Sequence, residues 1–151
     1  MRAPKRRPSS KGLEGSPDRS FTQANYEALA DFRYALRRFL AFSDSAAREA
    51  GLTPQQHQAL LTIKGSSDPA GTSIRQLASH LLVHHNSAVG LVDRLVEGGL
   101  VRRVRDEEDR RRARLELTAK AERILDSLTE AHVKELRAVR PALANVLQQL
   151  G

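Results

Sequence analysis

Residues 73–118 constrain the fold most, because two helical patterns and a hairpin pattern follow one another there without a break. The first pattern begins with a capping box, in which the Ser73 hydroxyl accepts from the amide of Gln76 and the Gln76 side chain reaches back to Ser73. Apolar residues then recur at helical spacing, at Ile74, Leu77, Ala78 and Leu81. The spacing predicts a short amphipathic helix.

A second helical pattern follows a turn at Val83-His84 and ends at Gly98-Gly99, where glycine can take the positive φ of a helix end. Its apolar face consists of Ala88, Leu91, Val92 and Leu95. The opposite face carries His85, Asn86, Val89, Gly90 and Asp93. We therefore expect the helix to pack by the first face and to leave the second open.

Two short segments, residues 101–105 and 112–117, predict a β-hairpin after this helix. The second alternates apolar and charged residues, whereas the tip at residues 106–111 (Asp-Glu-Glu-Asp-Arg-Arg) has no apolar side chain to bury. A helix-turn-helix followed by a basic hairpin is the geometry of a winged DNA-binding protein, whose second helix enters the major groove.

Long helical patterns flank this region. A capping box at Ser20 and Gln23 predicts the start of a helix over about residues 21–50, with an aromatic-rich stripe broad enough to indicate a dimer partner. Thr53, Pro54 and Gln56 predict a shorter helix that ends at Gly65. Thr118 is expected to cap a last helical region over residues 119–150, which Pro141 should break into a long and a short helix.

Composition narrows the class of protein. The 151 residues suit one domain, and the formal net charge of +7 indicates a polyanionic partner. Residues 1–19 are basic and rich in Pro and Ser, which predicts a disordered tail ahead of a domain at residues 20–151. The lack of cysteine excludes disulfides and thiolate metal sites. No stretch is apolar enough for a membrane span, and we expect a cytoplasmic protein.

The motifs between residues 77 and 118 resemble, in order and spacing, those of MarR-type transcriptional regulators. They are Leu77-Ala78, Ser87-Ala-Val-Gly-Leu-Val-Asp-Arg-Leu95, Gly99-Leu-Val-Arg102, Asp109-Arg-Arg111 and Leu117-Thr118. The resemblance extends from about Phe21 to the C-terminus. It implies a mainly α fold with a small β-ribbon. A winged helix-turn-helix core at about residues 53–118 would then lie between dimerisation helices at about 21–50 and 119–150.

Side chains that read a base sequence must reach the donors and acceptors on base edges. Helical phase directs four residues away from the core, among which Asn86 suits adenine, His85 suits guanine and Val89 suits a thymine methyl group. Gly90 is the fourth, and Ser87 with the first backbone amides of the helix suits a phosphate. A local helix cap is the alternative role for Asn86.

Three positions leave the contact pattern open. His84 is a further DNA-binding candidate, although MarR-like sequences often have a Ser cap there. Gly90 stands where many of them carry a longer polar or basic side chain. Asp93-Arg94 matches a pair common in the family, and either a structural ion pair or a phosphate contact suits Arg94.

The hairpin tip supplies the remaining DNA-binding candidates, Arg110, Arg111 and Arg112. The resemblance implies that Asp109 orients Arg111 while an arginine at the tip enters the minor groove. A narrow minor groove concentrates negative potential, which attracts arginine. We expect the acids at 106–109 to brace neighbouring arginines, and a merely solvated charged face is the alternative.

Other chemistry finds little support in the sequence. The five histidines lack the carboxylate or Cys partners of a metal site, so no metal or cofactor is expected. No catalytic motif indicates an enzyme. The resemblance implies an effector pocket between the dimerisation helices and the winged lobe. Its candidate wall residues are Phe39, Phe42, His57 and Leu61, for which a plain core role is the alternative.

These observations predict a homodimeric repressor that binds a pseudo-palindromic duplex operator and is released by a small-molecule effector. Two alternatives remain at this stage. One is a non-specific or architectural winged-helix nucleic-acid-binding protein, which the basic tail and Gly90 favour. The other is a winged helix used as a protein-interaction module, because a fold does not fix a function.

Overall fold

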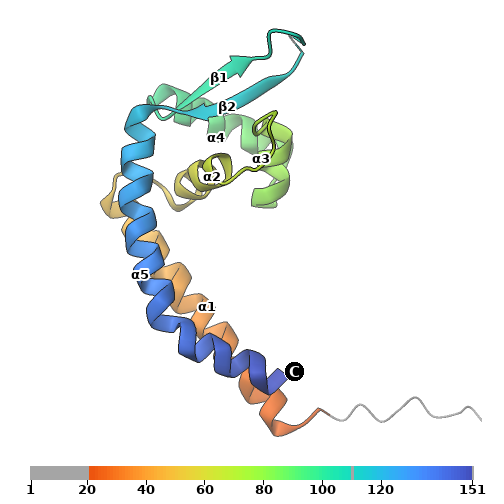
Figure 1. Ribbon diagram of the computed structural model, residues 1–151, viewed down its shortest axis with the longest axis vertical. Helices are drawn as coiled ribbons and strands as arrows, with labels where there is room; N and C mark the ends of the chain where they lie inside the picture. Colours follow the sequence, from red (N-terminus) through yellow and green to blue (C-terminus); the bar gives the residue numbers. More distant parts are fainter. Residues whose placement is uncertain (1–20, 110, 151) are drawn as a thin grey trace, which may run out of the picture.

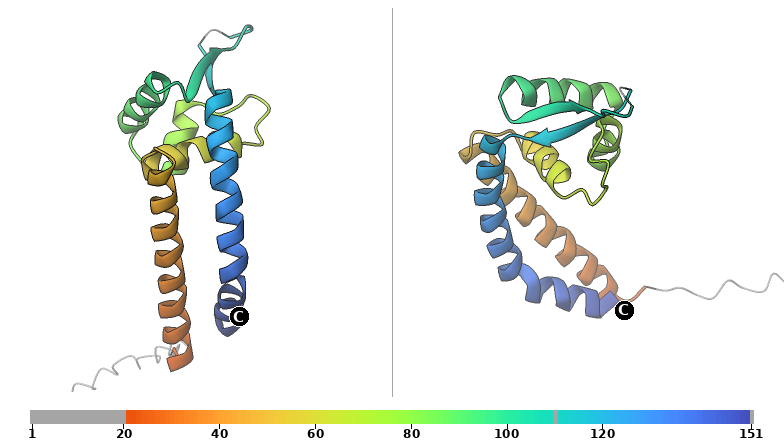
Figure 2. Two further views of the ribbon diagram at one scale, coloured as in Figure 1. Left: turned by 90° about the vertical axis from the view of Figure 1, so that its left-hand side faces the viewer. Right: turned by 45° about the horizontal axis from the view of Figure 1, so that its top comes forward.

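A computed structural model describes residues 21–109 and 111–150 of the chain. Two long helices, α1 (Gln23–Glu49) and α5 (Ala119–Leu150), pack together and extend from a small lobe, as Figures 1 and 2 show. The lobe contains α2 (Pro54–Lys64), α3 (Ile74–Leu81), α4 (His85–Glu97), β1 (Val101–Arg105) and β2 (Ala113–Leu117). The predicted fold class, mainly α with a small β-ribbon, is confirmed. The tail predicted at residues 1–19 lies outside the described residues.

Capping boxes begin the first three helices. Those at Thr53 for α2 and Ser73 for α3 are the ones predicted from the sequence. The box of α1 consists of Thr22 and Asn25, whose side-chain oxygens each accept from the other residue's backbone amide. The predicted box began at Ser20, which lies outside the described residues, and the helix starts two residues later because Asn25 can also close a box.

The last helix differs from the prediction. α5 continues to Leu150 with Pro141 inside it, so the expected break into two helices is wrong. An interior proline removes one backbone hydrogen bond and crowds the preceding turn, which a long helix can absorb by bending. The right-hand view of Figure 2 shows the C-terminal part of α5 turned away from its first part.

Thr118 joins the start of α5 to the lobe. Its hydroxyl accepts from the amide of Ala121 at 3.2 Å, as predicted for a helix cap, and donates to the carbonyl of Gly99 at 2.7 Å. The backbone amide of Thr118 also donates to the carbonyl of Leu100 at 3.0 Å. The long helix therefore begins at a fixed point at the base of the hairpin.

The core lies in the lobe, where the predicted apolar faces of α3 and α4 meet α2 and the sheet. On α4 the four residues of that face are buried, which confirms the predicted phase of the helix. On α3, Leu77 and Ala78 are buried, while Ile74 and Leu81 are partly buried. Each fully buried aliphatic side chain contributes about 1.5–3 kcal/mol, so burial of this face fixes the opposite face of α4 toward solvent.

Much of the apolar stripe on α1 is not covered by the same chain. Tyr26 is 58% exposed, Leu29 is 51% exposed and Leu40 is 46% exposed. On α5, Leu136 and Leu147 are exposed as well. Within the described part of the chain, no helix has the length and apolarity required to cross a membrane.

Candidate nucleic-acid interface

The N-terminal end of α4 is open to solvent and carries the predicted base-reading residues. His85, Asn86 and Ser87 are exposed, and Val89 and Gly90 are half-buried on the same helix. His84 is the residue before the helix, and its side chain makes no capping hydrogen bond. The first amides of α4 therefore lack a side-chain partner from the cap and can donate to a phosphate.

The turn before α4 contains a feature that sequence reasoning missed. Leu82 adopts a left-handed backbone with φ 55° and ψ 41°, and its side chain is 92% exposed. Leucine rarely takes this conformation, so nothing in the sequence indicated it. The left-handed backbone of Leu82 ends α3 and turns the chain toward the start of α4, and the backbone at this residue is strained.

The hairpin forms with the predicted pairing of its two segments. β1 and β2 are antiparallel, with Val101 opposite Leu117 and Arg105 opposite Ala113. The second strand starts one residue later than predicted. At the tip, the amide of Asp106 donates to the carbonyl of Arg112 at 3.0 Å, which closes the loop.

Two aspartates shape the hairpin tip through hydrogen bonds to its backbone. The Asp106 carboxylate accepts from the amide of Glu108 at 2.9 Å. The Asp109 carboxylate accepts from the backbone amide of Arg111 at 3.0 Å, and it also lies 3.9 Å from Nε of Arg112. Asp109 thus orients the backbone of Arg111 and pairs with the side chain of Arg112. Arg110 lies outside the described residues.

One ion pair links the hairpin to α4, and two others lie within its strands. Arg103 on β1 donates to the Asp93 carboxylate on α4, a contact that the sequence reasoning missed. Glu116 pairs with Arg114 at 2.9 Å and lies 3.7 Å from Arg102. Over the described residues, Arg105 and Arg111 take part in no ion pair, so their charges remain available to a polyanion.

Arg94 is free of an ion pair within the same part of the chain, because Asp93 pairs with Arg103. Its guanidinium lies beside Gly90: an added Cβ there would stand 3.5 Å from Nη1 of Arg94. The alternative of a structural ion pair for Arg94 is therefore not observed. The phosphate contact stays a prediction.

Gly71 marks another close approach, beside β2. It has φ +76°, and an added Cβ would stand 3.0 Å from Cδ of Arg114. A residue with a side chain would be strained by its backbone and would also displace that arginine. The glycine therefore allows the loop between α2 and α3 to run close beside β2, where Thr72 forms an isolated antiparallel bridge with Leu115.

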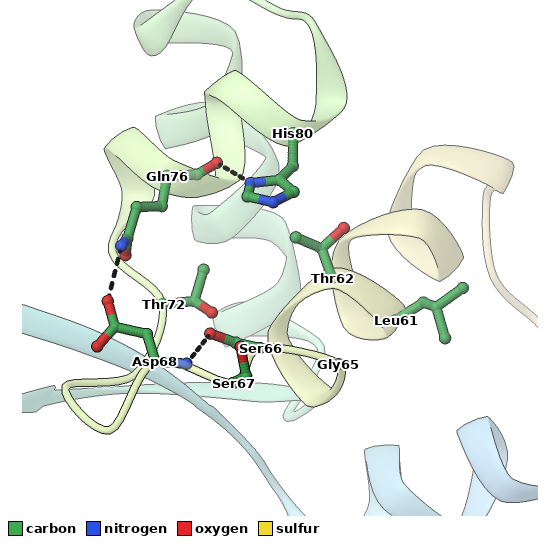
Figure 3. A pocket seen from close by; sticks show the side chains of 9 residues that line it. All are labelled: Leu61, Thr62, Gly65, Ser66, Ser67, Asp68, Thr72, Gln76 and His80. Atoms are coloured by element: carbon green, nitrogen blue, oxygen red, sulfur yellow. Dashed lines mark hydrogen bonds between the residues drawn. The ribbon is translucent and has the colours of Figure 1, made fainter.

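The effector candidates divide between two places. Phe39 and Phe42 pack edge-on against His132, with ring centroids 5.8 and 5.3 Å away, and His57 lies 4.8 Å from the same ring. Leu61 instead lines a cavity formed by α2, the loop at residues 65–72 and α3 (Figure 3). The wall assignment for these four residues stays a prediction.

His132 is tied into this cluster by two hydrogen bonds. Its Nδ1 donates to the carbonyl of Leu128 at 2.6 Å, and its Nε2 lies 2.8 Å from the Ser43 hydroxyl. His57 is buried, and its Nδ1 has no hydrogen-bond partner in the described parts of the chain. Burial first, and then the charge of His132, lower the pKa of His57. Among the described residues, no group of three His, Asp or Glu side chains is arranged to hold a metal ion.

Comparison with known proteins gives three similarities. A model of the MarR family matches residues 50–112. The transcriptional regulator PecS of Dickeya dadantii is 26% identical over 88 residues, which cover 58% of this chain and 53% of PecS, so the chain spans about half of that relative. The uncharacterized regulator YsmB of Bacillus subtilis is 28% identical over 120 residues, covering 77% of this chain and 80% of YsmB.

A solved structure of a regulator is also similar to this chain. The transcriptional regulator MOSR of M. tuberculosis, solved in complex with DNA, is 29% identical with a TM-score of 0.50. That match covers 75% of this chain and 77% of MOSR. The family model matches a region that contains α2, α3, α4, β1 and the hairpin tip, and α4 and the hairpin carry the DNA-binding candidates described above.

Proposed function

Because the chain belongs to the MarR family of winged helix-turn-helix transcriptional regulators, we propose that it is a homodimeric repressor of a pseudo-palindromic operator. DNA binding and regulation of transcription are properties of the family. The homodimer, the repression and the operator symmetry are the further steps of the proposal.

One observation carries the DNA-binding mode. The exposed N-terminal turn of α4 and the hairpin tip belong to one lobe, and Arg103 and Asp93 tie β1 to α4. In winged-helix proteins such a helix enters the major groove while basic side chains beside it contact the backbone or the minor groove. Arg105 and Arg111 supply unpaired charge on the hairpin, and His85 and Asn86 supply base-reading groups on the helix.

The exposed apolar faces of α1 and α5 support a homodimer. An apolar groove of about 430 Å³ runs along α5 and is lined by residues that include Val133, Leu136 and Leu147. Large exposed apolar surfaces mark interaction sites in proteins that are otherwise soluble. A second copy of the chain fits this surface best. A two-fold axis would pair the arm formed by α1 and α5 with the same arm of the second copy. It would also set the two α4 helices about one duplex turn apart.

Footprinting on the promoter of the protein's own gene tests the operator. The proposal expects protection of two half-sites about one helical turn apart, related by a two-fold axis. Competition with bulk DNA measures the ratio of specific to non-specific affinity, which should be at least about a thousandfold. Uniform protection with a ratio near one would instead indicate the architectural, non-specific alternative.

Release by a small molecule is the last step of this proposal. The site favoured is the junction of α1, α2 and α5, where Phe39, Phe42 and His57 surround His132. A ligand that opens this cluster would change the angle between the lobe and the arm formed by α1 and α5. Such a ligand shifts operator affinity only if it binds one of these two arrangements of lobe and arm more tightly than the other. Screening for compounds that shift operator affinity in the parent and not in Phe42→Ala tests the location.

A further inference from the structure

The open face of α4 carries an arginine side chain that lies over a glycine of the preceding turn. Gly90 belongs to the second turn of the helix, and Arg94 follows one turn later. A Cβ added at Gly90 would stand 3.5 Å from Nη1 of Arg94. Among the described residues, no other atom would lie within 4 Å of that Cβ, apart from the residues next to Gly90 and the backbone of the helix. The guanidinium therefore covers the place where a side chain at position 90 would begin.

Helix geometry explains why the side chain takes this direction. The Cα–Cβ bonds of an α-helix tilt toward its N-terminus, so a long side chain lies over the turn before its own Cα. Residues four positions apart form a row along the helix surface, and Asn86, Gly90 and Arg94 form such a row on α4. Because Gly90 has no side chain, Arg94 can extend along this row toward Asn86 and the exposed N-terminal turn.

The charge of Arg94 is available within the part of the chain that the structure describes. The residue is exposed and takes part in no ion pair there. The adjacent carboxylate, that of Asp93, instead accepts from Arg103 on β1. A guanidinium has five N–H donors in a fixed plane, and those of Arg94 are therefore not taken up by a neighbouring acid.

The position over Gly90 favours a base contact over a phosphate contact. By helical phase, Arg94 begins beside the buried stripe of α4, whereas Gly90 lies nearer the middle of the open face. A side chain that stayed at the edge of this face would meet the phosphates beside the groove. Since the guanidinium of Arg94 lies over Gly90, its donors are moved toward the middle of the face, which is the part that meets base edges in the major groove.

Guanine is the base that suits this group. Its N7 and O6 atoms are paired acceptors in the major groove, and an arginine that donates to both makes the commonest specific contact between protein and DNA. Glycine also allows the backbone of a helix to approach a ligand closely. We propose that Arg94 reads one guanine in each half-site through the space that Gly90 leaves open, an inference that rests on the operator binding proposed above.

Selection of duplexes from a random-sequence pool provides a binding site without knowledge of the target gene. Each base pair of one half-site is then replaced in turn, and fluorescence anisotropy measures the affinity of the full chain. The parent should bind about tenfold more weakly when one particular G·C pair is replaced. Arg94→Ala should be indifferent to that replacement and should keep the parent's losses at the other pairs. Arg123→Ala, which removes an exposed arginine from α5, should keep every loss.

Two variants at Gly90 test the route of the side chain. Gly90→Leu fills the space under the guanidinium and adds no charge or hydrogen-bonding group, so binding should become indifferent to the same G·C pair. Gly90→Ala adds a Cβ in ordinary contact with Arg94, at 3.5 Å, and should keep the parent's preference. Where the leucine prevents DNA binding altogether, the comparison of Arg94→Ala with the parent decides.

The outcomes separate this inference from the operator binding on which it rests. An Arg94→Ala protein that binds all sequences more weakly, by one common factor, would indicate a phosphate contact and overturn the inference alone. A Gly90→Leu protein with the parent's preference for the G·C pair would overturn the route over Gly90. A parent chain that selects no sequence from the pool would overturn the operator binding, and the inference with it.

Discussion

At the scale of single residues, Arg111 combines two properties at the hairpin tip. A hydrogen bond of 3.0 Å from its amide to Asp109 holds its backbone, and its side-chain charge has no ion-pair partner among the described residues. Arg111→Ala should weaken operator binding about tenfold and lower the salt dependence by about one ion per subunit. Fluorescence anisotropy over a salt series measures both quantities. Arg123→Ala, which removes an exposed arginine from α5, is the charge-matched control.

Dimerisation should be the same in both variants, because neither side chain lies on the exposed apolar stripe. An Arg111→Ala protein with the parent's affinity and the parent's salt slope would rule out a wing contact by this residue.

Leu82 offers a test of backbone strain. A left-handed residue with a Cβ costs about 1–2 kcal/mol, and asparagine tolerates this conformation better than leucine does. The side chain is 92% exposed, so little packing is lost on replacement. Leu82→Asn should therefore raise the free energy of unfolding by about 0.5–1 kcal/mol, measured by urea denaturation. Leu82→Ala lacks the polar side chain that lets asparagine hydrogen-bond locally in this conformation, so it should show no such gain. A gain of equal size in both variants would place the effect in the loss of exposed leucine.

His57 predicts how stability depends on pH. Burial and then the charge of His132 lower its pKa from 6.5, so the folded chain binds this proton less readily than the unfolded chain does. The stabilisation is complete above pH 6.5 and is lost as the pH falls from there toward the lower pKa of the folded state. His57→Gln should flatten this part of the profile in urea denaturation at a series of pH values. A His57→Gln protein whose stability falls with pH as steeply as the parent's would contradict this prediction.

At the scale of elements, the sequence predicted what depends on neighbours along the chain. The capping boxes at Thr53 and Ser73, the apolar face of α4 and the pairing of the hairpin all follow from residues a few positions apart. Contacts that depend on how elements meet were not predictable in this way. Examples are the ion pair of Asp93 with Arg103 and the approach of His57 to His132, 75 positions further along the chain.

In the candidate site, too, some features were predictable from the sequence and others were not. Helical phase identified the exposed end of α4, since the buried face determines the open one. Asp109 was predicted as a brace, but its side-chain partner, Arg112, depends on the turn of the tip.

Pro141 gives a prediction about a single element. Inside α5 it removes a backbone hydrogen bond, and a proline in a helix interior costs about 3 kcal/mol relative to alanine. Pro141→Ala should therefore raise the free energy of unfolding, by about 1–3 kcal/mol, in urea denaturation. Pro54→Ala is the matched control, because proline is favoured at the first position of a helix and its loss should bring no gain. Lower stability in Pro141→Ala would indicate that the bend itself is needed for packing.

At the scale of the whole molecule, the two parts of the chain differ in how much of their apolar surface they bury themselves. The lobe buries its own core around Leu60, Leu77 and Leu95, whereas the arm formed by α1 and α5 exposes apolar side chains over much of its length. Such an arm is stable in water only if something covers it. The charge of the hairpin and the apolar surface of the arm thus belong to separate interactions, and one should be removable without the other.

Leu136→Glu tests that separation. Leu136 is 43% exposed and lines the apolar groove on α5, so a carboxylate there would be desolvated in a dimer and hydrated in a monomer. Sedimentation equilibrium should show a monomer, circular dichroism should show that the helices are retained, and operator affinity should fall because two half-sites are no longer bound together. Ser127→Glu adds the same charge to an exposed position of α5 and should remain a dimer with the parent's affinity. A Leu136→Glu protein that stays dimeric would place the subunit interface elsewhere, and a monomer that binds the operator as tightly as the parent would show that pairing of two lobes is not what recognition requires.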